Sequence, residues 1–142
     1  MKKFFFLIKT FVIFLFLISS GMTKESNSFD KGVELFQNKQ FEKSKVFFER
    51  DIVFNPKNEK SYLYLAKIYK ENEEEEEEEV NLNNVLLLNP QNDEAIYMLT
   101  LLKIKQSNYD QAKKLITQFT LVCKSFCSKK KEMQDKFKKL TP

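Results

Sequence analysis

The residues of this chain whose types and spacing could do chemistry are two cysteines and a run of glutamates. Cys123 and Cys127 stand four positions apart, and glutamate fills every position of 73–79. The sequence contains no histidine, the side chain that most often moves protons near neutral pH and most often binds metal ions. A general acid–base pair or an activated nucleophile needs tuned partners held together in a pocket. The composition therefore predicts a protein that is not an enzyme.

The spacing of Cys123 and Cys127 is compatible with several roles. Four residues apart on a helix, they share a face, whereas a chain that turns between them closes a disulfide easily. A structural zinc ion needs four ligands, and a redox-active pair normally reads Cys-x-x-Cys, so no metal site is expected. The alternatives are a disulfide and two small buried side chains, and the choice depends on the compartment.

The first 21 residues have the order of a secretory signal. Lys2 and Lys3 precede an apolar stretch that ends at Ile18, and small residues follow as far as Gly21. This order is typical of a cleaved signal peptide, and the uninterrupted apolar run from Phe11 is shorter than the roughly 20 residues of a spanning helix. We therefore expect residues 1–21 to be a signal peptide and the protein to be exported. Export favours the disulfide, because oxidising compartments preserve such bonds. An uncleaved membrane tether is the alternative.

Composition narrows the fold and the partners. Two glycines and three prolines in 142 residues favour helices over an all-β domain with many turns. The formal net charge is only +4, and three of the lysines lie in the expected signal peptide. A protein that neutralises many phosphates needs a larger basic surplus, so we expect no nucleic-acid partner.

The phrase Asn-Pro-x-Asn occurs at Asn55 and again at Asn89. Each proline excludes the preceding residue from the helical conformation, so a helix must end there. After the first phrase, Tyr62, Leu65, Ala66 and Tyr69 follow the spacing of an amphipathic helix. The interval between the two phrases, about 34 residues, is the period of a helix–turn–helix repeat.

These residues resemble the tetratricopeptide repeat (TPR) family, and a small exported bacterial protein of that family in particular. Further positions that match its pattern are Gly32, Phe41, Ser44, Phe48, Leu82, Val85, Tyr109, Ala112, Ile116 and Phe119. The resemblance implies an all-α solenoid with three TPR hairpins in residues 22–124, at about 25–58, 59–92 and 93–124. Residues 125–142 would form a basic amphipathic capping helix.

In this family the first helices of the units line a concave groove. The positions that face it here are Phe29, Val33, Phe36, Leu63, Lys67, Lys70, Tyr97, Leu101 and Ile104. The resemblance thus implies a non-enzymatic interaction module or scaffold that binds a peptide or helix of another protein in this groove, without a cofactor. It does not imply the family's lysine-and-asparagine clamp for acidic tails, because apolar residues stand here. The alternative is that these helices are rotated by one residue, so that the apolar line belongs to the core.

The glutamate run falls on the turn and first positions of an expected helix. Like charges three or four positions apart on a helix repel, and Glu78 stands where the family has a small packed residue. We therefore expect this helix to start late or to fray at its beginning. The run itself is interpreted as a solvated low-complexity stretch, with calcium or a basic partner as the less favoured alternatives.

The lysine-rich C-terminal segment carries Phe126, Met133, Phe137 and Leu140 on one helical stripe. A solenoid needs a terminal cap with a polar outer face, and this helix suits that role. The alternative is a surface helix that binds anionic lipid, which would make the protein a peripheral lipid-binding protein. With a cleaved signal peptide, we expect the protein in the periplasm or cell envelope, in contact with a membrane only if the N-terminal segment is retained.

Overall fold

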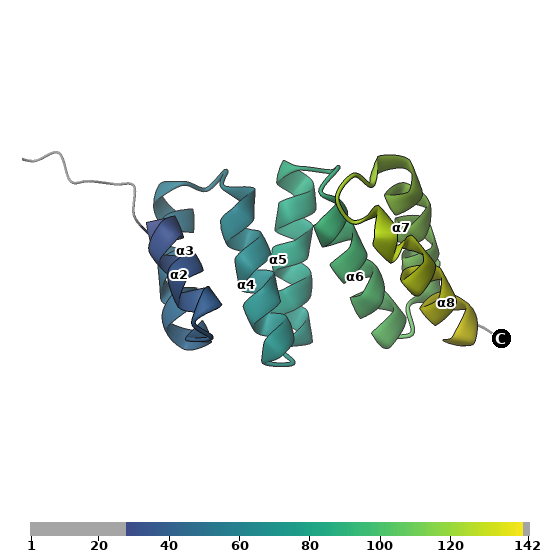
Figure 1. Cartoon of the computed structure of the whole chain (residues 1–142), viewed down its shortest axis with the longest axis horizontal. Helices are drawn as coiled ribbons and strands as arrows, with labels where there is room; N and C mark the ends of the chain where they lie inside the picture. The colour runs from purple at the N-terminus through teal and green to yellow at the C-terminus, as the bar shows by residue number, and fades with distance from the viewer. Residues whose placement is uncertain (1–27, 141–142) are drawn as a thin grey trace, which may run out of the picture.

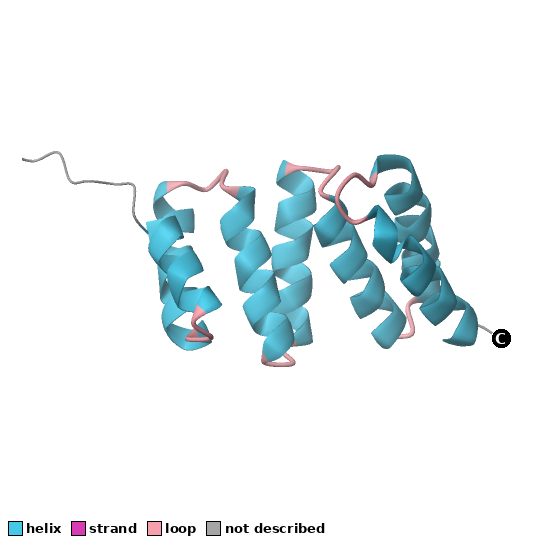
Figure 2. Cartoon of the chain, viewed as in Figure 1, coloured by secondary structure: helices cyan, strands magenta, loops and turns pink. Residues whose placement is uncertain are grey.

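The computed structural model describes residues 28–140 as a row of antiparallel helices (Figures 1 and 2). The expected signal peptide lies outside the described residues. Within that range there is no strand, and the elements follow one another along the row. They are α2 (Ser28–Gln37), α3 (Phe41–Phe54), α4 (Glu59–Glu71), α5 (Glu75–Leu88), α6 (Asp93–Lys105), α7 (Tyr109–Val122), a 3-10 turn η2 (Cys127–Lys129) and α8 (Lys130–Leu140).

The helix boundaries repeat with the period of the sequence. The second helices of the hairpins begin at Phe41, Glu75 and Tyr109, and α4 and α6 begin at Glu59 and Asp93. Each of these intervals equals the one between the two Asn-Pro-x-Asn phrases. Helices α2 and α3, α4 and α5, and α6 and α7 pack as pairs, and α8 follows the last pair. The expected all-α solenoid of three hairpins with a terminal helix is therefore confirmed.

The expectation that the glutamate-rich helix starts late is wrong. Helix α5 begins at Glu75, in register with its counterparts. Two ion pairs to α6 offset the repulsion: the Nζ of Lys105 lies 2.7 Å from Glu75, and that of Lys103 lies 2.5 Å from Glu79. The helix N-terminus also favours negative charge in its first turn.

Each hairpin turn contains one residue in the left-handed conformation. Lys39, Glu73 and Ser107, which are spaced by the same repeat interval, have φ values of 56°, 61° and 58°. Around the first of them, the N–H of Lys39 donates to the carbonyl of Phe36 and that of Gln40 to the carbonyl of Leu35, both at 2.9 Å. The other two turns repeat these bonds. This is the Schellman pattern, which satisfies the last carbonyls of a helix.

The Asn-Pro-x-Asn phrases form the turns between hairpins. In each phrase the second asparagine donates its backbone N–H to the carbonyl of the first, at 2.9 Å for Asn58 and 3.1 Å for Asn92. The side chains of the same two residues then cap the next helix, accepting from the N–H of Lys60 at 3.3 Å and of Ala95 at 2.9 Å. The phrase therefore recurs because its proline ends one helix and its last asparagine begins the next.

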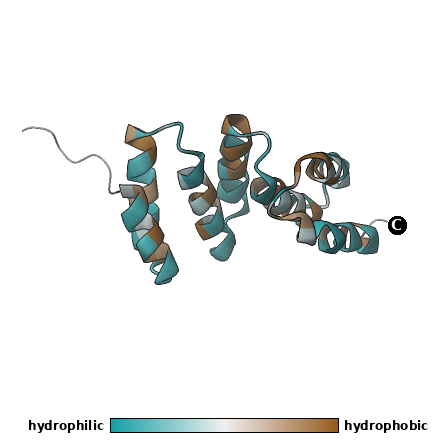
Figure 3. Ribbon diagram, turned by 45° about the horizontal axis from the view of Figure 1, so that its top comes forward, coloured by the Kyte–Doolittle hydropathy of each residue, from teal (hydrophilic) through white to brown (hydrophobic). Residues whose placement is uncertain are grey.

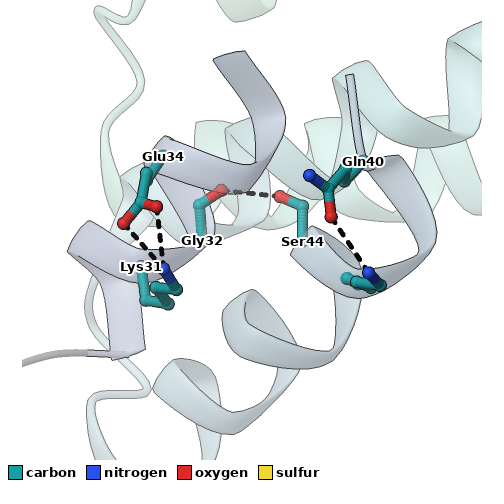
Figure 4. A network of polar contacts seen from close by, with 6 residues as sticks. Lys31, Gly32, Glu34, Gln40 and Ser44 are labelled. Carbon is teal, nitrogen blue, oxygen red and sulfur yellow. Dashed lines mark hydrogen bonds and ion pairs between the residues drawn. The ribbon is translucent and has the colours of Figure 1, made fainter. Parts of the chain in front are cut away.

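Small residues allow the two helices of the first hairpin to cross closely. The hydroxyl of Ser44 on α3 donates a 2.8 Å hydrogen bond to the carbonyl of Gly32 on α2 (Figure 4). A Cβ atom at Gly32 would lie 2.7 Å from the buried ring of Phe48. Only glycine fits this crossing without moving the ring.

Buried apolar residues form two clusters along the row. The first lies around Phe48, Leu65 and Ile68, between α2, α3 and α4. The second extends from α4 to α8 and includes Leu82, Phe119 and other buried side chains. Figure 3 shows hydrophobic residues distributed along the whole row, as expected where each hairpin buries the apolar face of its neighbour.

The chain after α7 is held to the third hairpin by three kinds of contact. Cys123 and Cys127 are joined by a disulfide, with their Cα atoms 5.2 Å apart. The Oδ2 atom of Asp93 accepts the backbone N–H groups of Lys124, Ser125 and Phe126 at 2.7, 2.7 and 2.9 Å. The side chain of Met133 on α8 is fully buried. Among residues 28–140, no helix has the length and apolar character needed to cross a membrane.

Candidate functional site

The first helices of the hairpins, α2, α4 and α6, lie on one side of the row (Figure 1). They line an open hollow of about 420 Å³, which we call the first hollow. Its lining residues are Phe29, Asp30, Val33, Lys60, Leu63, Tyr64, Lys67 and Glu94. The hollow thus lies between the first and second units and reaches the start of the third.

The apolar wall of the first hollow is an aromatic cluster. The ring of Tyr64 stacks on that of Phe48, with centroids 4.9 Å apart. The rings of Phe29 and Phe36 contact the Tyr64 ring edge-on, with centroid distances of 5.9 and 5.1 Å. Because the fully buried ring of Phe48 supports Tyr64 from behind, this wall is preorganised.

The charged wall of the first hollow contains both positively and negatively charged side chains. The Nζ of Lys67 lies 2.8 Å from a carboxylate oxygen of Glu94 and 5.1 Å from the centroid of the Tyr64 ring. Both side chains are about a quarter exposed. Lys60 and Asp30 are exposed at the edge. This arrangement suits a ligand with one apolar group and polar groups beside it.

The structure divides the nine predicted groove residues into three sets. Phe29, Val33, Leu63 and Lys67 line the first hollow, although Leu63 is only 8% exposed. Lys70 and Leu101 line a second hollow, described below. The remaining three are Phe36, which packs between Phe41 and Tyr64, and Tyr97 and Ile104, which are buried.

The prediction that Tyr97 and Ile104 offer contact surface is wrong. Tyr97 is 8% exposed and Ile104 is 5% exposed. The capping segment covers Tyr97: its hydroxyl donates a 2.9 Å hydrogen bond to Glu132, and its ring centroid lies 6.0 Å from that of Phe126. Burial and the Glu132 carboxylate raise the pKa of Tyr97 to about 12. At Tyr97 and Ile104 the alternative interpretation as core therefore holds, whereas Leu101 of the same line reaches the second hollow.

The second hollow lies between the end of α4, the start of α5 and α6, and has a volume of about 190 Å³. It is lined by Lys70, Glu73, Glu75, Glu78, Met98, Leu101, Leu102 and Lys105. Glu78 is 5% exposed. Burial raises the pKa of Glu78 to about 7, against the opposing effect of Lys70 and Lys105.

Several lining residues escaped the sequence analysis, although the period could have found them. In the first hollow, Asp30 and Tyr64 occupy the same position of successive units, as do Lys60 and Glu94. Asp30 and Tyr64 each follow a predicted groove residue in the sequence, and Lys60 and Glu94 lie at the start of a helix. The sequence analysis could have found them by assuming that equivalent positions of two neighbouring units line the hollow between them. Glu78 was noticed only as a misfit to the family pattern.

The apolar stripe of the C-terminal helix is used in packing. Met133 is fully buried, and the ring of Phe137 contacts that of Tyr109 edge-on, with centroids 6.2 Å apart. Of the stripe, Leu140 alone is exposed, at 54%, and the rest of α8 is mostly hydrophilic (Figure 3). Insertion of this stripe into lipid would therefore require α8 to leave the third hairpin.

Comparison with known proteins identifies the fold. No protein-family model matches the chain, and no curated protein matches it. Among solved structures it is similar to the TPR2B domain of yeast Sti1 in a complex with pHsp70, with a TM-score of 0.75 and 14% identity over 83% of this chain and 98% of that one. It is also similar to a tetratricopeptide repeat protein from Parabacteroides merdae, with a TM-score of 0.75 and 19% identity over 86% of this chain and 47% of that one.

A third similar structure is YrrB, a TPR protein with an unusual peptide-binding site. Its TM-score is 0.71 and its identity 14%, over 89% of this chain and 63% of that one. Together with the regular interval between equivalent helices, these matches show that the chain has the tetratricopeptide repeat fold.

Proposed function

We propose that this chain is a non-enzymatic interaction module that binds a peptide segment of another protein in its concave groove, at the first hollow. The observation that carries the proposal is the hollow itself, which is open, has a rigid aromatic wall and is lined by the first helices of all three hairpins. Two of the similar structures support it: one is a complex with pHsp70 and the other has a peptide-binding site.

The lining defines the chemistry of the expected peptide. A volume of about 420 Å³ is within the range of roughly 300–1,000 Å³ typical of ligand pockets. An apolar or aromatic side chain would pack between Phe29 and Leu63. Polar groups of the same segment would meet Lys60 and the paired Lys67 and Glu94. Such an anchor with a polar surround is the usual composition of a peptide groove.

We further propose that the module acts in the bacterial cell envelope. The support is the order of charge, apolar run and small residues in positions 1–21. Mass spectrometry of the N-terminus of the protein purified from its native membrane and periplasmic fractions tests this. A chain that starts after about Gly21 supports an exported soluble module, whereas a retained Met1 supports a membrane-tethered subunit of an envelope complex.

Selection of peptides from a displayed random library, on the purified protein, tests the binding function. Val33→Ala should weaken the selected peptides about tenfold, because a truncated apolar contact loses roughly 1–2 kcal/mol. Leu87→Ala is the matched control, since Leu87 is 80% exposed on α5 and lies outside the hollow. Failure to select any peptide, or equal binding by both variants, would contradict the proposal.

A further inference from the structure

We infer that the second hollow receives a cationic side chain, lysine or arginine, of the bound peptide, with Glu78 as its counter-charge. The inference rests on the proposed function and names a specificity that neither the fold nor the similar structures assign. It follows from four properties of the hollow: an unpaired carboxylate, a net negative lining, a small volume and apolar walls.

The carboxylate of Glu78 opens into the hollow, where the positive charges that act on it are those of Lys70 and Lys105. The residue is 5% exposed and lines the hollow. Its side chain makes no hydrogen bond or ion pair among the residues that the structure describes. A charged group in such a place is costly unless something pairs with it. The hollow in front of Glu78 is the space from which that pairing would come.

The charges that face Glu78 come from every element around it. Lys70 lies at the end of α4, Glu73 in the turn, Glu75 on α5 and Lys105 on α6. Two lysines against three glutamates leave a net charge of −1 in the lining when all are ionised. Lys105 is already engaged with Glu75, at 2.7 Å. The hollow therefore attracts a cation and repels a carboxylate.

The volume and walls restrict the ligand to one side chain. About 190 Å³ is below the roughly 300 Å³ at which small-molecule pockets begin. Met98, Leu101 and Leu102 form an apolar wall against which the aliphatic stem of a lysine or arginine would pack while its charged end reaches Glu78. A bare metal ion is a poor alternative, because no group of three or more potential ligand side chains is clustered within residues 28–140.

The position of the hollow connects it to the groove. Lys70 and Leu101 belong to the apolar-and-basic line that the repeat pattern directs toward the concave side, and they lie on α4 and α6. These two helices also line the first hollow, through Leu63, Lys67 and Glu94. A peptide that follows the groove along α4 and α6 could place an apolar residue in one hollow and a basic residue in the other.

Titration with n-butylguanidinium, followed by the amide signals of the folded chain, tests the inference without knowledge of the partner. At pH 8 we expect saturable shifts centred on Glu78, Met98 and Leu101. Glu78→Gln, which keeps the size of the side chain, should weaken this binding at least tenfold. Glu76→Gln is the matched control, since Glu76 belongs to the same run but is exposed. Neutral n-butylurea should not bind.

A second measurement needs no variant. Because the pKa of Glu78 is raised to about 7, wild-type protein should bind n-butylguanidinium several-fold more weakly at pH 5.5, where the carboxylate is protonated, than at pH 8. Absence of saturable shifts at pH 8, or equal binding by wild type and Glu78→Gln, would overturn the inference. Peptide capture that survives such a result, and still depends on Val33, would leave the proposed function standing.

Discussion

The hydroxyl of Tyr97 donates a hydrogen bond of 2.9 Å to a carboxylate oxygen of Glu132, and this contact fastens the capping helix to the third hairpin. Glu132 also receives the ammonium groups of Lys129 at 3.0 Å and Lys136 at 3.2 Å. The hydrogen bonds from Lys129, Tyr97 and Lys136 together lower the pKa of Glu132 to about 2. A cluster of charged contacts around Glu132 thus covers the buried ring of Tyr97.

Tyr97→Ala should destabilise the protein by roughly 2–4 kcal/mol, because it removes a buried aromatic ring and its packing against Phe126. Tyr97→Phe keeps the ring and should cost only about 1 kcal/mol for the lost hydrogen bond. Urea unfolding of both variants measures the difference. Tyr97→Ala with wild-type stability but impaired peptide binding would restore the original interpretation of Tyr97 as a groove contact.

The carboxylate of Asp93 should give the C-terminal turn a pH-dependent stability. Partial burial opposes its ionisation, but the backbone N–H groups of Phe126, Lys124 and Ser125 outweigh that effect and hold the pKa of Asp93 below its usual value. A lowered pKa in the folded state stabilises the fold above the unfolded value of 3.8, and this contribution is lost as the pH falls through the folded pKa.

Asp93→Asn should therefore lower the free energy of unfolding at pH 7, by roughly 1–2 kcal/mol for the weakened charge-assisted bonds. The difference from wild type should shrink as the pH falls below 3.8, the ordinary pKa of an aspartate. Urea titrations at pH 7, 5 and 3 measure it. Asp110→Asn is the control, because Asp110 is exposed in the first turn of α7 and has no such cluster of donors. A pH-independent loss in Asp93→Asn would contradict the electrostatic account.

The repeat period predicted the architecture because local rules set it. Pro56 and Pro90 each follow the end of a helix, Asn58 and Asn92 cap the next one, and packing buries the apolar positions that repeat with the helix period. Those rules act within one or two units. They need no knowledge of the rest of the chain, so the hairpins and their register followed from the sequence.

The wrong predictions concern residues whose surroundings are formed by segments distant in the sequence. Tyr97 was assigned to the groove because the repeat pattern does not say what covers the last unit, and here α8 does. The late start of α5 was expected because repulsion was added up within the glutamate run, whereas Lys103 and Lys105 reach it from α6. The burial of Glu78 likewise depends on side chains from α4, α5 and α6 together.

Glycine at the left-handed position of each hairpin turn should stabilise the protein. Lys39, Glu73 and Ser107 have positive φ, where side chains with a Cβ atom cost roughly 1 kcal/mol and glycine does not. The greater freedom of glycine in the unfolded chain returns part of this gain. Each single replacement by glycine should therefore raise the unfolding free energy by a few tenths of a kcal/mol to about 1 kcal/mol.

The matched control for these replacements is the residue one position earlier. Asn38, the neighbour of Lys39, has no positive φ, so Asn38→Gly gains nothing in the folded state and should be neutral or destabilising. Chemical denaturation of Lys39→Gly and Asn38→Gly measures the unfolding free energy of each variant relative to wild type. A gain in both variants, or in neither, would show that the turn conformation does not limit stability.

Glu78→Gln should stabilise the fold at alkaline pH. The folded-state pKa of Glu78, about 7, lies above its ordinary value of 4.5, so the folded chain disfavours the ionised form. Wild-type stability should therefore rise as the pH falls from 8 through 7 and level off below about 4.5. The variant lacks this titration and should exceed wild type by on the order of 1–3 kcal/mol at pH 8, with little difference at pH 4.

Thermal or urea unfolding of wild type, Glu78→Gln and Glu76→Gln across this range measures the effect. Glu76→Gln should follow wild type, because Glu76 is exposed. The lowest concentration of n-butylguanidinium that saturates the amide shifts should stabilise wild type relative to Glu78→Gln at pH 8. Both proteins experience the general denaturing effect of guanidinium, and only wild type binds the ligand in its folded state. Parallel pH profiles of wild type and Glu78→Gln would show that the carboxylate is solvated in the folded chain and has no need of a counter-charge.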